Sequence, residues 1–323
     1  MDVPEVLLRR EQIIDSVREF FKAEGLTEVE TPLLVESPGL EPHLDPFPVR
    51  AARPLFLITS PEYAMKKLLA AGSGDIFQLA KSFRDEPTGP THLPEFTMLE
   101  WYRTGADYRT VMNDCERLAA YVANAVCGDS AVRWQGEQLD LEPPVERMTV
   151  RQAFQRYAGL SLRFDEPLAR LRELAEAAGA TDLADDDTWD DVFFKVFLRF
   201  IEPRIGRGRP TILYDYPARM AALSRIRTDD PLVCERFELY AGGLELANAF
   251  SELTDPAEQR RRFEADNAER ERLGKTPLPV DEDLLDALGR MPPSAGVALG
   301  LDRLMMLLTD TPDIRDVVPL PPG

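Results

Sequence analysis

The chain has 323 residues, of which 44% are hydrophobic and 29% are charged, a composition typical of a soluble globular protein. No apolar run approaches the roughly 20 residues that a membrane span needs, and the first residues lack the apolar stretch of a secretory signal. The formal net charge of −19 is opposite in sign to that of most proteins that bind nucleic acid over a large surface. We therefore expect neither a membrane protein nor stable tRNA binding.

Residues 9–24 place apolar side chains at i, i+3, i+4 and i+7 spacing before Gly25, which predicts an amphipathic helix. Residues 27–31 predict a strand that ends at Pro32. Residues 54–59 predict a strand that leads into a short helix, with Ser60 as its N-cap and Pro61 as its first residue. Strands are then predicted at 76–84 and 97–103, and a helix at 110–126.

The pattern changes to helical from about 143 to 209, and we interpret this segment as a helical insertion within one domain spanning residues 1–323. Strands are predicted again at 211–216, 236–243 and 244–250, and residues 296–308 predict a glycine-rich strand that runs into a helix. Strands in neighbouring runs favour an α+β domain with a mainly antiparallel sheet. Basic and acidic residues alternate over 259–275 at helical spacing, which predicts a solvated helix face.

The cysteines and histidines are few. Cys115, Cys127 and Cys234 are odd in number and form no C-x-x-C pair, which indicates free thiols in a reducing cytoplasm. His43 and His92 are the two histidines, so imidazole acid–base catalysis has few candidates. An enzyme of this composition would depend on Arg, Glu or a metal ion for charge stabilisation.

The stretch 83–103 combines charged and aromatic residues. If residues 95–103 are extended, Phe96, Met98, Glu100 and Tyr102 share one face, which suits a ligand with both a flat ring and an amine. The preceding P-T-G-P is a turn able to fold over a ligand, and the planar guanidinium of Arg84 matches a phosphate. Ion pairs on the protein surface are the alternative interpretation.

Two later patterns are weaker. Glu245 and Glu252 could share Mg²⁺, which prefers oxygen ligands together with nucleotide phosphates, but their spacing of seven requires a bulge or strand end between them. Gly296 and Gly300 allow close approach of a ligand to the backbone, and Arg303 would begin a helix where a phosphate is favourable. The alternatives are unrelated surface glutamates and glycines required for packing.

Taken together and in order, these pieces resemble the catalytic domain of class II aminoacyl-tRNA synthetases, and within them the lysyl branch. The strand ending at Pro32 is similar to the first motif of that family, a dimer-interface element. F-R-D-E…H-L-P-E-F-T-M-L-E-W-Y is similar to the second, and G-V-A-L-G-L-D-R to the third; I-R-D-V also matches the lysyl branch. The resemblance implies a class II antiparallel sheet flanked by helices, and a homodimer.

The first motif begins near Gly25, so we expect no anticodon-binding domain. The resemblance is therefore narrower, to stand-alone paralogues that attach (R)-β-lysine, or lysine more weakly, to elongation factor P. S-P-E-Y-x-M-K-x-L-L and L-E-L-A-N-x-F carry it. It implies ATP and Mg²⁺ as cofactors, an aminoacyl-adenylate, and transfer of the acyl group to the ε-amine of a lysine. A truncated lysyl-tRNA synthetase and an inactive amino-acid-binding regulator are the alternatives.

The resemblance also implies residue roles for the nucleotide. Arg84 would contact the α-phosphate and act with Arg303 as the catalytic pair, while Glu86 would bind the adenine amino group and Phe96 would stack on the ring. Glu245 and Glu252 would hold Mg²⁺. The complete set expected to bind ATP is Arg84, Asp85, Glu86, His92, Leu93, Phe96, Glu245, Leu246, Gly300 and Arg303.

For the amino acid, Glu62 would bind the amine near the carboxylate, and Tyr102 with Glu252 would bind the distal amine. The complete expected set is Ser60, Pro61, Glu62, Glu100, Tyr102, Asn248, Glu252 and Ala298. Three positions depart from the residues that the family usually has: Leu93 stands in place of Asn, and Ala249 and Ala298 in place of Gly. We hypothesise that Ala298 shapes the pocket towards β-lysine, since one methyl group changes discrimination by roughly 1–3 kcal/mol.

Overall fold

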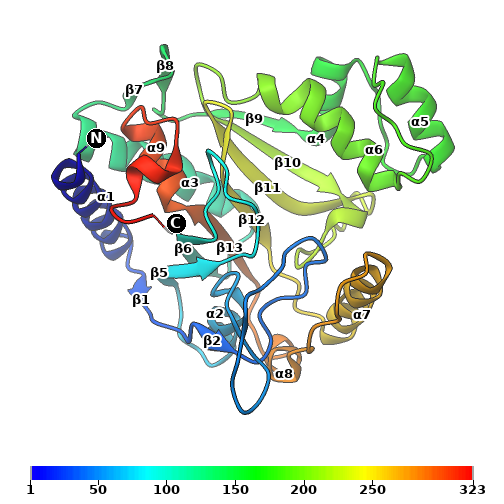
Figure 1. The fold of residues 1–323 in the computed structure, drawn as a ribbon, viewed down its shortest axis with the longest axis horizontal. Helices are drawn as coiled ribbons and strands as arrows, with labels where there is room; N and C mark the ends of the chain where they lie inside the picture. Colours follow the sequence, from blue (N-terminus) through cyan, green and yellow to red (C-terminus); the bar gives the residue numbers. More distant parts are fainter. Residues whose placement is uncertain (1, 322–323) are drawn as a thin grey trace.

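The structure is a computed structural model that describes residues 2–321. Its centre is a sheet of eight strands (Figure 1). In spatial order these are β1 (Thr27–Glu28), β5 (Ile76–Phe83), β6 (Glu95–Thr104), β13 (Ser294–Gly300), β12 (Leu244–Ser251), β11 (Val233–Ala241), β10 (Thr211–Pro217) and β9 (Glu146–Thr149). The two edge pairs, β1 with β5 and β9 with β10, are parallel and every other pair is antiparallel. The predicted mainly antiparallel α+β sheet is confirmed.

Three helices cover one face of this sheet: α1 (Val3–Ala23), α3 (Tyr108–Cys127) and α9 (Leu301–Leu308). Residues at alternate positions of the central strands, such as Leu99 and Trp101, are fully buried against them. The ring of Phe21 on α1 stacks on Phe77 with centroids 5.0 Å apart and tilts against Trp101 at 5.1 Å. The main hydrophobic core therefore lies on this face, which leaves the opposite face of the sheet for a site.

Helix α1 is longer than predicted, because Asp2 caps it by accepting a hydrogen bond from the backbone N–H of Glu5 at 3.0 Å. The position of α1 on the sheet is fixed by a residue that is far from it in the sequence. Asp302, at the start of α9, accepts hydrogen bonds from Arg10 at 2.6 Å and from the backbone N–H of Thr97 at 2.7 Å. One buried carboxylate thus joins α1, α9 and β6.

Eight smaller elements lie outside the main sheet and its three covering helices. They are β2 (Leu34–Val35), β3 (Pro48–Val49), β4 (Leu55–Leu57), α2 (Glu62–Ala70), β7 (Ala131–Trp134), β8 (Glu137–Asp140), α7 (Pro256–Arg272) and α8 (Glu282–Leu288). Helix α7 covers most of the basic segment 259–275. Many of its charges are exposed and paired with each other, for example Arg272 with Glu269 at 2.6 Å, which confirms the predicted solvated face.

The segment 143–209 forms a lobe beside β9 and β10 (Figure 1). It begins with strand β9, which we had included in a wholly helical insertion. It then forms α4 (Val150–Ala153), α5 (Leu168–Ala177) and α6 (Trp189–Val196), with π-helical turns after α4 and α6. Its core is aromatic, with Phe193 stacked on Trp189 at 5.5 Å and packed on Phe154 at 4.6 Å.

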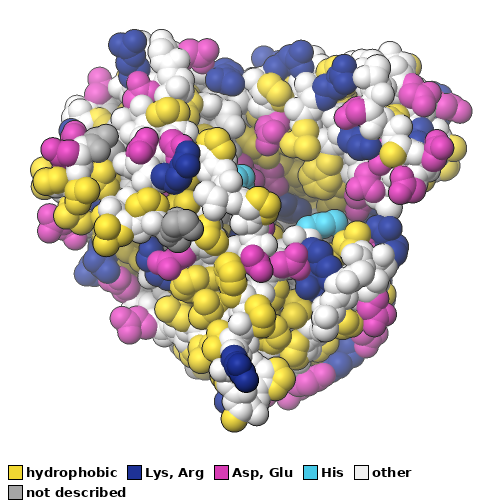
Figure 2. Space-filling view, viewed as in Figure 1, with side chains coloured by type: hydrophobic (Ala, Val, Ile, Leu, Met, Phe, Trp, Pro, Cys, Tyr) yellow, Lys and Arg dark blue, Asp and Glu magenta, His cyan; other side chains and the backbone are white. Residues whose placement is uncertain are grey.

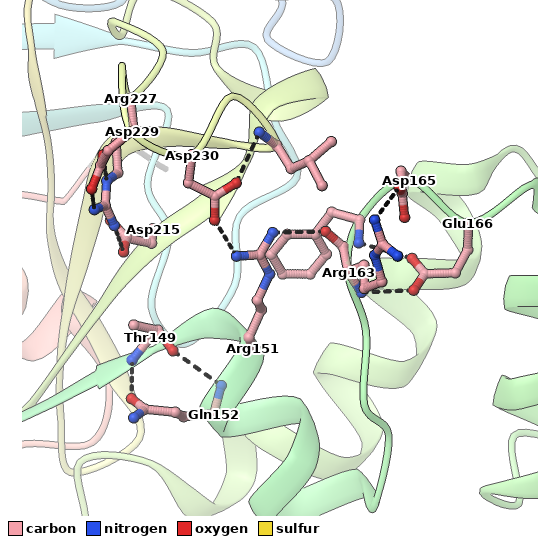
Figure 3. A network of polar contacts seen from close by, with 12 residues as sticks. Thr149, Arg151, Gln152, Arg163, Asp165, Glu166, Asp215, Arg227, Asp229 and Asp230 are labelled. Carbon is pink, nitrogen blue, oxygen red and sulfur yellow. Dashed lines mark hydrogen bonds and ion pairs between the residues drawn. The ribbon is translucent and has the colours of Figure 1, made fainter.

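A polar network attaches the lobe to the sheet (Figure 3). Arg151 forms an ion pair with Asp230, donates a hydrogen bond to the carbonyl of Arg163 at 2.7 Å, and lies 4.9 Å from the ring centre of Phe164. Arg227, in the same segment between β10 and β11 as Asp230, pairs with Asp215 of β10 at 2.6 Å and so holds this segment on the sheet. The lobe is therefore joined by the ion pair of Arg151 to a segment that is fixed to the sheet, as well as by its apolar core.

No helix within residues 2–321 is long and apolar enough to cross a membrane. All three cysteines are free thiols, as predicted.

Candidate active site

The face of the sheet opposite α1, α3 and α9 forms the floor of a cavity of about 370 Å³, which opens into the hollow visible in Figure 2. Strand β6 supplies Phe96, Met98, Glu100 and Tyr102 to this floor, which confirms that they share one face. Strand β13 lies beside it in register, with Ala298 opposite Glu100. Part of the stretch 83–103 thus lines a cavity, and the alternative of surface ion pairs is wrong for Glu100 and Tyr102, which are buried.

Strand β12 contains the bulge that the spacing of its two glutamates requires. Ala247 is opposite Leu239, but Glu245 is opposite Tyr240, so Leu246 is an extra residue. The irregularity turns Glu245 to the same face as Asn248, and both line the cavity.

At the amine-binding end of the cavity, as we name it, Glu62 and Glu100 line the wall, and the buried ammonium of Lys66 joins Glu62 to a third carboxylate, Glu252, which does not itself line the cavity. The Nζ atom of Lys66 donates a hydrogen bond to Glu62 at 2.5 Å and forms an ion pair with Glu252 at 2.5 Å. The hydroxyl of Tyr102 donates to Oε1 of Glu100 at 2.6 Å, and Oε2 of Glu100 has no hydrogen-bond partner within residues 2–321. Carboxylates therefore outnumber ammonium groups in a buried place.

This imbalance changes the titration of each group. Burial, with Glu62 nearby, raises the pKa of Glu252 to about 8, although Lys66 opposes the shift. Burial and the same neighbour raise the pKa of Glu100 well above its usual value. Against the effect of burial, Glu252 and Glu62 raise the pKa of Lys66, which stays charged. A ligand that brings an ammonium group would stabilise the ionised carboxylates, so this end suits an amine.

Gly296 is required for packing, which was the alternative interpretation of this strand. A Cβ atom there would lie 2.3 Å from Cε1 of Tyr102 and 2.7 Å from Oε1 of Glu252. The close approach at Gly296 is made by two side chains of the protein, and Gly296 also lines the cavity. Glycine at this position lets Tyr102 and Glu252 both lie against the backbone of β13.

The phosphate-binding end, as we name it, contains the guanidinium groups of Arg84, Arg236 and Arg303. Arg303 donates to the carbonyl of Glu245 at 2.8 Å and to the carbonyl of Thr91 at 3.2 Å, and its Nη2 lies 2.7 Å from Nε2 of His92. Burial and Arg303 lower the pKa of His92, so we assign a neutral imidazole whose Nε2 accepts from Arg303. This fixes the guanidinium in place.

Arg84 is the second cation of this end. Its guanidinium carbon lies 5.2 Å from the ring centre of Phe96, and its Nε atom is shielded from solvent without a hydrogen-bond partner among the described residues. Burial lowers the pKa of Arg84, while Glu41 and Glu86 oppose the shift. A buried guanidinium with an unused donor is a favourable place for an anionic oxygen.

The sequence did not reveal Arg236, which orients the floor of the same end. It donates to Oδ1 of Asn248 at 3.1 Å and to Oε1 of Glu238 at 2.7 Å. Burial and Glu238 raise the pKa of Glu245 to about 7, while Arg303, Arg236 and Arg84 lower it. Glu245 is thus a carboxylate surrounded by the three guanidinium groups of this end.

The residues present suit Mg²⁺ only in company with a phosphate. Glu245 faces the guanidinium groups, whereas Glu252 faces Lys66 and Glu62. Within residues 2–321, no group of three or more Asp, Glu, His or Cys side chains is arranged to hold a metal ion. Glu245 with nucleotide oxygens could complete a ligand set; a magnesium ion shared by Glu245 and Glu252 stays a prediction.

Most of the remaining predicted residues also line the cavity: Ser60, Glu86, Leu93, Leu246 and Gly300. Three predicted residues do not. Asp85 is exposed, Glu252 lies beneath the floor against Lys66, and Pro61 is the N-cap of α2. The predicted N-cap Ser60 is wrong by one residue, because α2 begins at Glu62 and no side chain caps it.

The structure also explains two departures from the family pattern. Leu93 is buried in the main hydrophobic core as well as lining the cavity, so an apolar residue suits its surroundings. Ala249 is fully buried opposite Phe237 and Val297, on the helix-covered face, so it does not enter the cavity. Of the residues that we missed, Lys66 had a signal, since it lies four residues after Glu62 on a predicted helix.

Comparison with known proteins agrees with this geometry. Residues 2–322 match the family of tRNA synthetases class II (D, K and N). The chain belongs to this family. The chain is also 44% identical, over 97% of its length and 93% of the relative, to the elongation factor P–(R)-β-lysine ligase of Erwinia tasmaniensis. Ligases of the same name from Salmonella paratyphi A and Salmonella dublin are 42% identical over the same shares. The fold is therefore that of a class II synthetase.

Proposed function

We propose that this class II synthetase homologue activates (R)-β-lysine with ATP, and lysine more weakly, and transfers the acyl group to a lysine ε-amine of elongation factor P. One observation carries the proposal: a single cavity has excess buried carboxylates at one end and three guanidinium groups at the other. The ammonium groups of a diamino acid match the carboxylates, and the phosphates of a nucleoside triphosphate match the guanidinium groups. The relatives that match 97% of the chain are named elongation factor P–(R)-β-lysine ligase.

At the amine-binding end, the substrate would place its distal ammonium near Tyr102, Glu100 and Glu252, where an oxygen of Glu100 lacks a partner. Glu62 would bind the amine near the carboxylate, with Ser60 beside it in the cavity wall. Asn248 and Ala298 face each other across paired strands, so both border the space for the carbon chain.

At the phosphate-binding end, Phe96 and Glu86 would bind the adenine, and Arg84, His92 and Arg303 the phosphates. The substrate carboxylate, which is already ionised, would attack the α-phosphorus and release pyrophosphate. This step needs no general base, so positioning and charge neutralisation by Arg84 are the main contributions. When bound, Mg²⁺ would neutralise phosphate charge beside Glu245.

We also propose a homodimer in the cytoplasm. Large apolar side chains are exposed on α1 and near the strand that resembles the dimer motif, among them Leu7, Leu8 and Leu34. Covering such residues with a second copy would remove apolar area from water. Free thiols are compatible with a reducing compartment.

ATP–pyrophosphate exchange tests the activation step. We expect exchange with (R)-β-lysine, weaker exchange with lysine, and little with norleucine, which lacks the distal amine. Glu252→Gln should reduce exchange with both lysines, whereas Glu173→Gln, an exposed substitution on α5, should not. Equal exchange with norleucine, or none with either lysine, would refute the proposal.

A further inference from the structure

The loop between β2 and β3, residues 36–47, brings a carboxylate into the cavity that the activation step does not use. This is Glu41. Its Oε2 atom is shielded from solvent and has no hydrogen-bond partner within the described residues. The carboxylates of the amine-binding end differ from it in having a charged or hydroxyl neighbour: Glu62 and Glu252 form ion pairs with Lys66, and Oε1 of Glu100 accepts from Tyr102, although Oε2 of Glu100 also lacks a partner within the described residues.

Glu41 lines the cavity together with Glu62 of the amine-binding end and Arg84 of the phosphate-binding end. Beside the larger effect of burial, Glu62 raises the pKa of Glu41 and Arg84 lowers it. A substrate carboxyl group joined to the α-phosphate would lie at the boundary between the two ends, because its amine belongs to one end and its phosphate to the other. Glu41 is therefore close to the place where an acyl-adenylate would react.

The loop is held firmly on several sides. Arg270 of α7 donates to the carbonyl of Leu44 at 2.8 Å, and Lys275 donates to the carbonyl of Pro42 at 3.1 Å. The backbone N–H of Asp85, next to Arg84, donates to the carbonyl of Asp45 at 2.7 Å. A Cβ atom on Gly39, whose φ is +118°, would lie 2.7 Å from Oε2 of Glu41. These contacts fix the carboxylate relative to Arg84.

Acyl transfer has a chemical requirement that activation lacks. The acceptor lysine arrives as an ammonium ion, since its ordinary pKa is about 10.4, and must lose a proton before its nitrogen can attack. Glu86, which also lines the cavity and has no ion pair or side-chain hydrogen bond among residues 2–321, is assigned to the adenine in the proposed function. Burial and Glu62 raise the pKa of Glu41, which makes its carboxylate a stronger proton acceptor.

On the basis of the proposed function, we propose that Glu41 is the general base that accepts the proton of the incoming lysine ammonium during acyl transfer. The neutral nitrogen then forms a bond to the acyl carbon, and the bond from that carbon to the phosphate oxygen breaks. The second N–H proton passes to the leaving phosphate oxygen, so the products are the amide, AMP and protonated Glu41.

The role of Glu41 is tested by measuring activation and acyl transfer separately, and by comparing two nucleophiles in the transfer step. Pyrophosphate exchange with (R)-β-lysine reports activation alone. Decay of the preformed enzyme-bound adenylate is then measured with elongation factor P, and with hydroxylamine, which is neutral at neutral pH and needs no base. The variants are Glu41→Gln, Glu41→Asp and the control Glu36→Gln, an exposed acid of the same loop.

We expect Glu41→Gln to keep pyrophosphate exchange and hydroxamate formation but to slow transfer to elongation factor P by about 100-fold or more. Glu41→Asp should retain part of the transfer, and Glu36→Gln should match the unaltered protein. Unchanged transfer by Glu41→Gln would overturn the inference, as would an equal loss of exchange, which would assign Glu41 to amino-acid binding. Absence of exchange in the unaltered protein would instead contradict the proposed function.

Discussion

Lys66 shows how one residue sets the chemistry of the amine-binding end. Its ammonium contacts Glu62 and Glu252, yet a third carboxylate, Glu100, keeps an oxygen without a partner within residues 2–321. Burying one cation among three acids leaves the group short of positive charge, and burying uncompensated charge is costly. The site is therefore organised to receive ammonium groups.

Gly296 should not tolerate a side chain. Gly296→Ala would place a methyl group within 2.3 Å of Tyr102, and such overpacking costs about 1–3 kcal/mol. We expect a lower free energy of unfolding in a denaturant titration and a higher KM for lysine. Gly289→Ala is the control, because its Cβ would lie 3.4 Å from Pro256, near ordinary contact. If both variants behave alike, the close packing of Tyr102 does not matter.

Ligand binding should depend on pH through Glu252. Its pKa is about 8 in the folded protein against an ordinary 4.5, so between these values the folded state binds more protons than the unfolded state. The free energy of unfolding contributed by Glu252 therefore falls as pH rises through this window.

Bound lysine should offset this loss of stability, because its ammonium group stabilises the ionised carboxylate of Glu252. We expect the gain in Tm with saturating lysine to grow as pH rises from about 6 to about 8, measured by thermal denaturation. Glu252→Gln should flatten the trend. A gain that is constant or falls with pH would contradict the assignment of Glu252 to the amine.

Individual strands and helices show which structural features a sequence pattern predicts correctly and which it does not. The alternation of β6 predicted the shared face of Phe96 and Tyr102, because side chains of a strand alternate between faces. The requirement for a bulge near Glu245 was also correct. The cap of α2 was wrong because Ser60, a good cap by type, precedes Pro61 and the helix begins one residue later.

A substitution at Arg151 tests how the helical lobe is held on the rest of the molecule. Arg151→Ala removes an ion pair with Asp230 and a contact with Phe164, worth together about 1 kcal/mol. We expect amide hydrogen exchange in residues 150–177 to become about five-fold faster, with pyrophosphate exchange unchanged. Arg170→Ala, which removes an exposed pair with Glu173, is the matched control. Equal exchange rates in both variants would show that the network does not secure the lobe.

Across the whole molecule, features that depend on contacts between distant segments are those that the sequence alone does not predict. The sheet, its helices and most of the cavity lining were predictable, because periodic patterns and ordered motifs report them. Glu41, Arg236 and Asp302 were not, because each acts through partners far away in the chain and no local spacing indicates those partners.

The distribution of charge is also a property of the whole molecule. The net charge is −19, and the cavity cations Arg84, Arg236 and Arg303 face inward. On α7, basic residues are paired with acids, for example Arg261 with Glu258 at 2.7 Å. The paired charges of α7 leave fewer free cations for phosphates on this helix than an extended nucleic-acid surface requires. That a protein and not a tRNA is the acceptor stays a prediction.

The most direct test of the central claim is the identity of the acceptor. The protein is incubated with ATP and (R)-β-lysine together with elongation factor P and tRNA, and both macromolecules are then analysed by mass spectrometry. We predict that elongation factor P gains one β-lysyl group on a lysine side chain while the tRNA stays uncharged. Charged tRNA with unmodified elongation factor P would contradict the account.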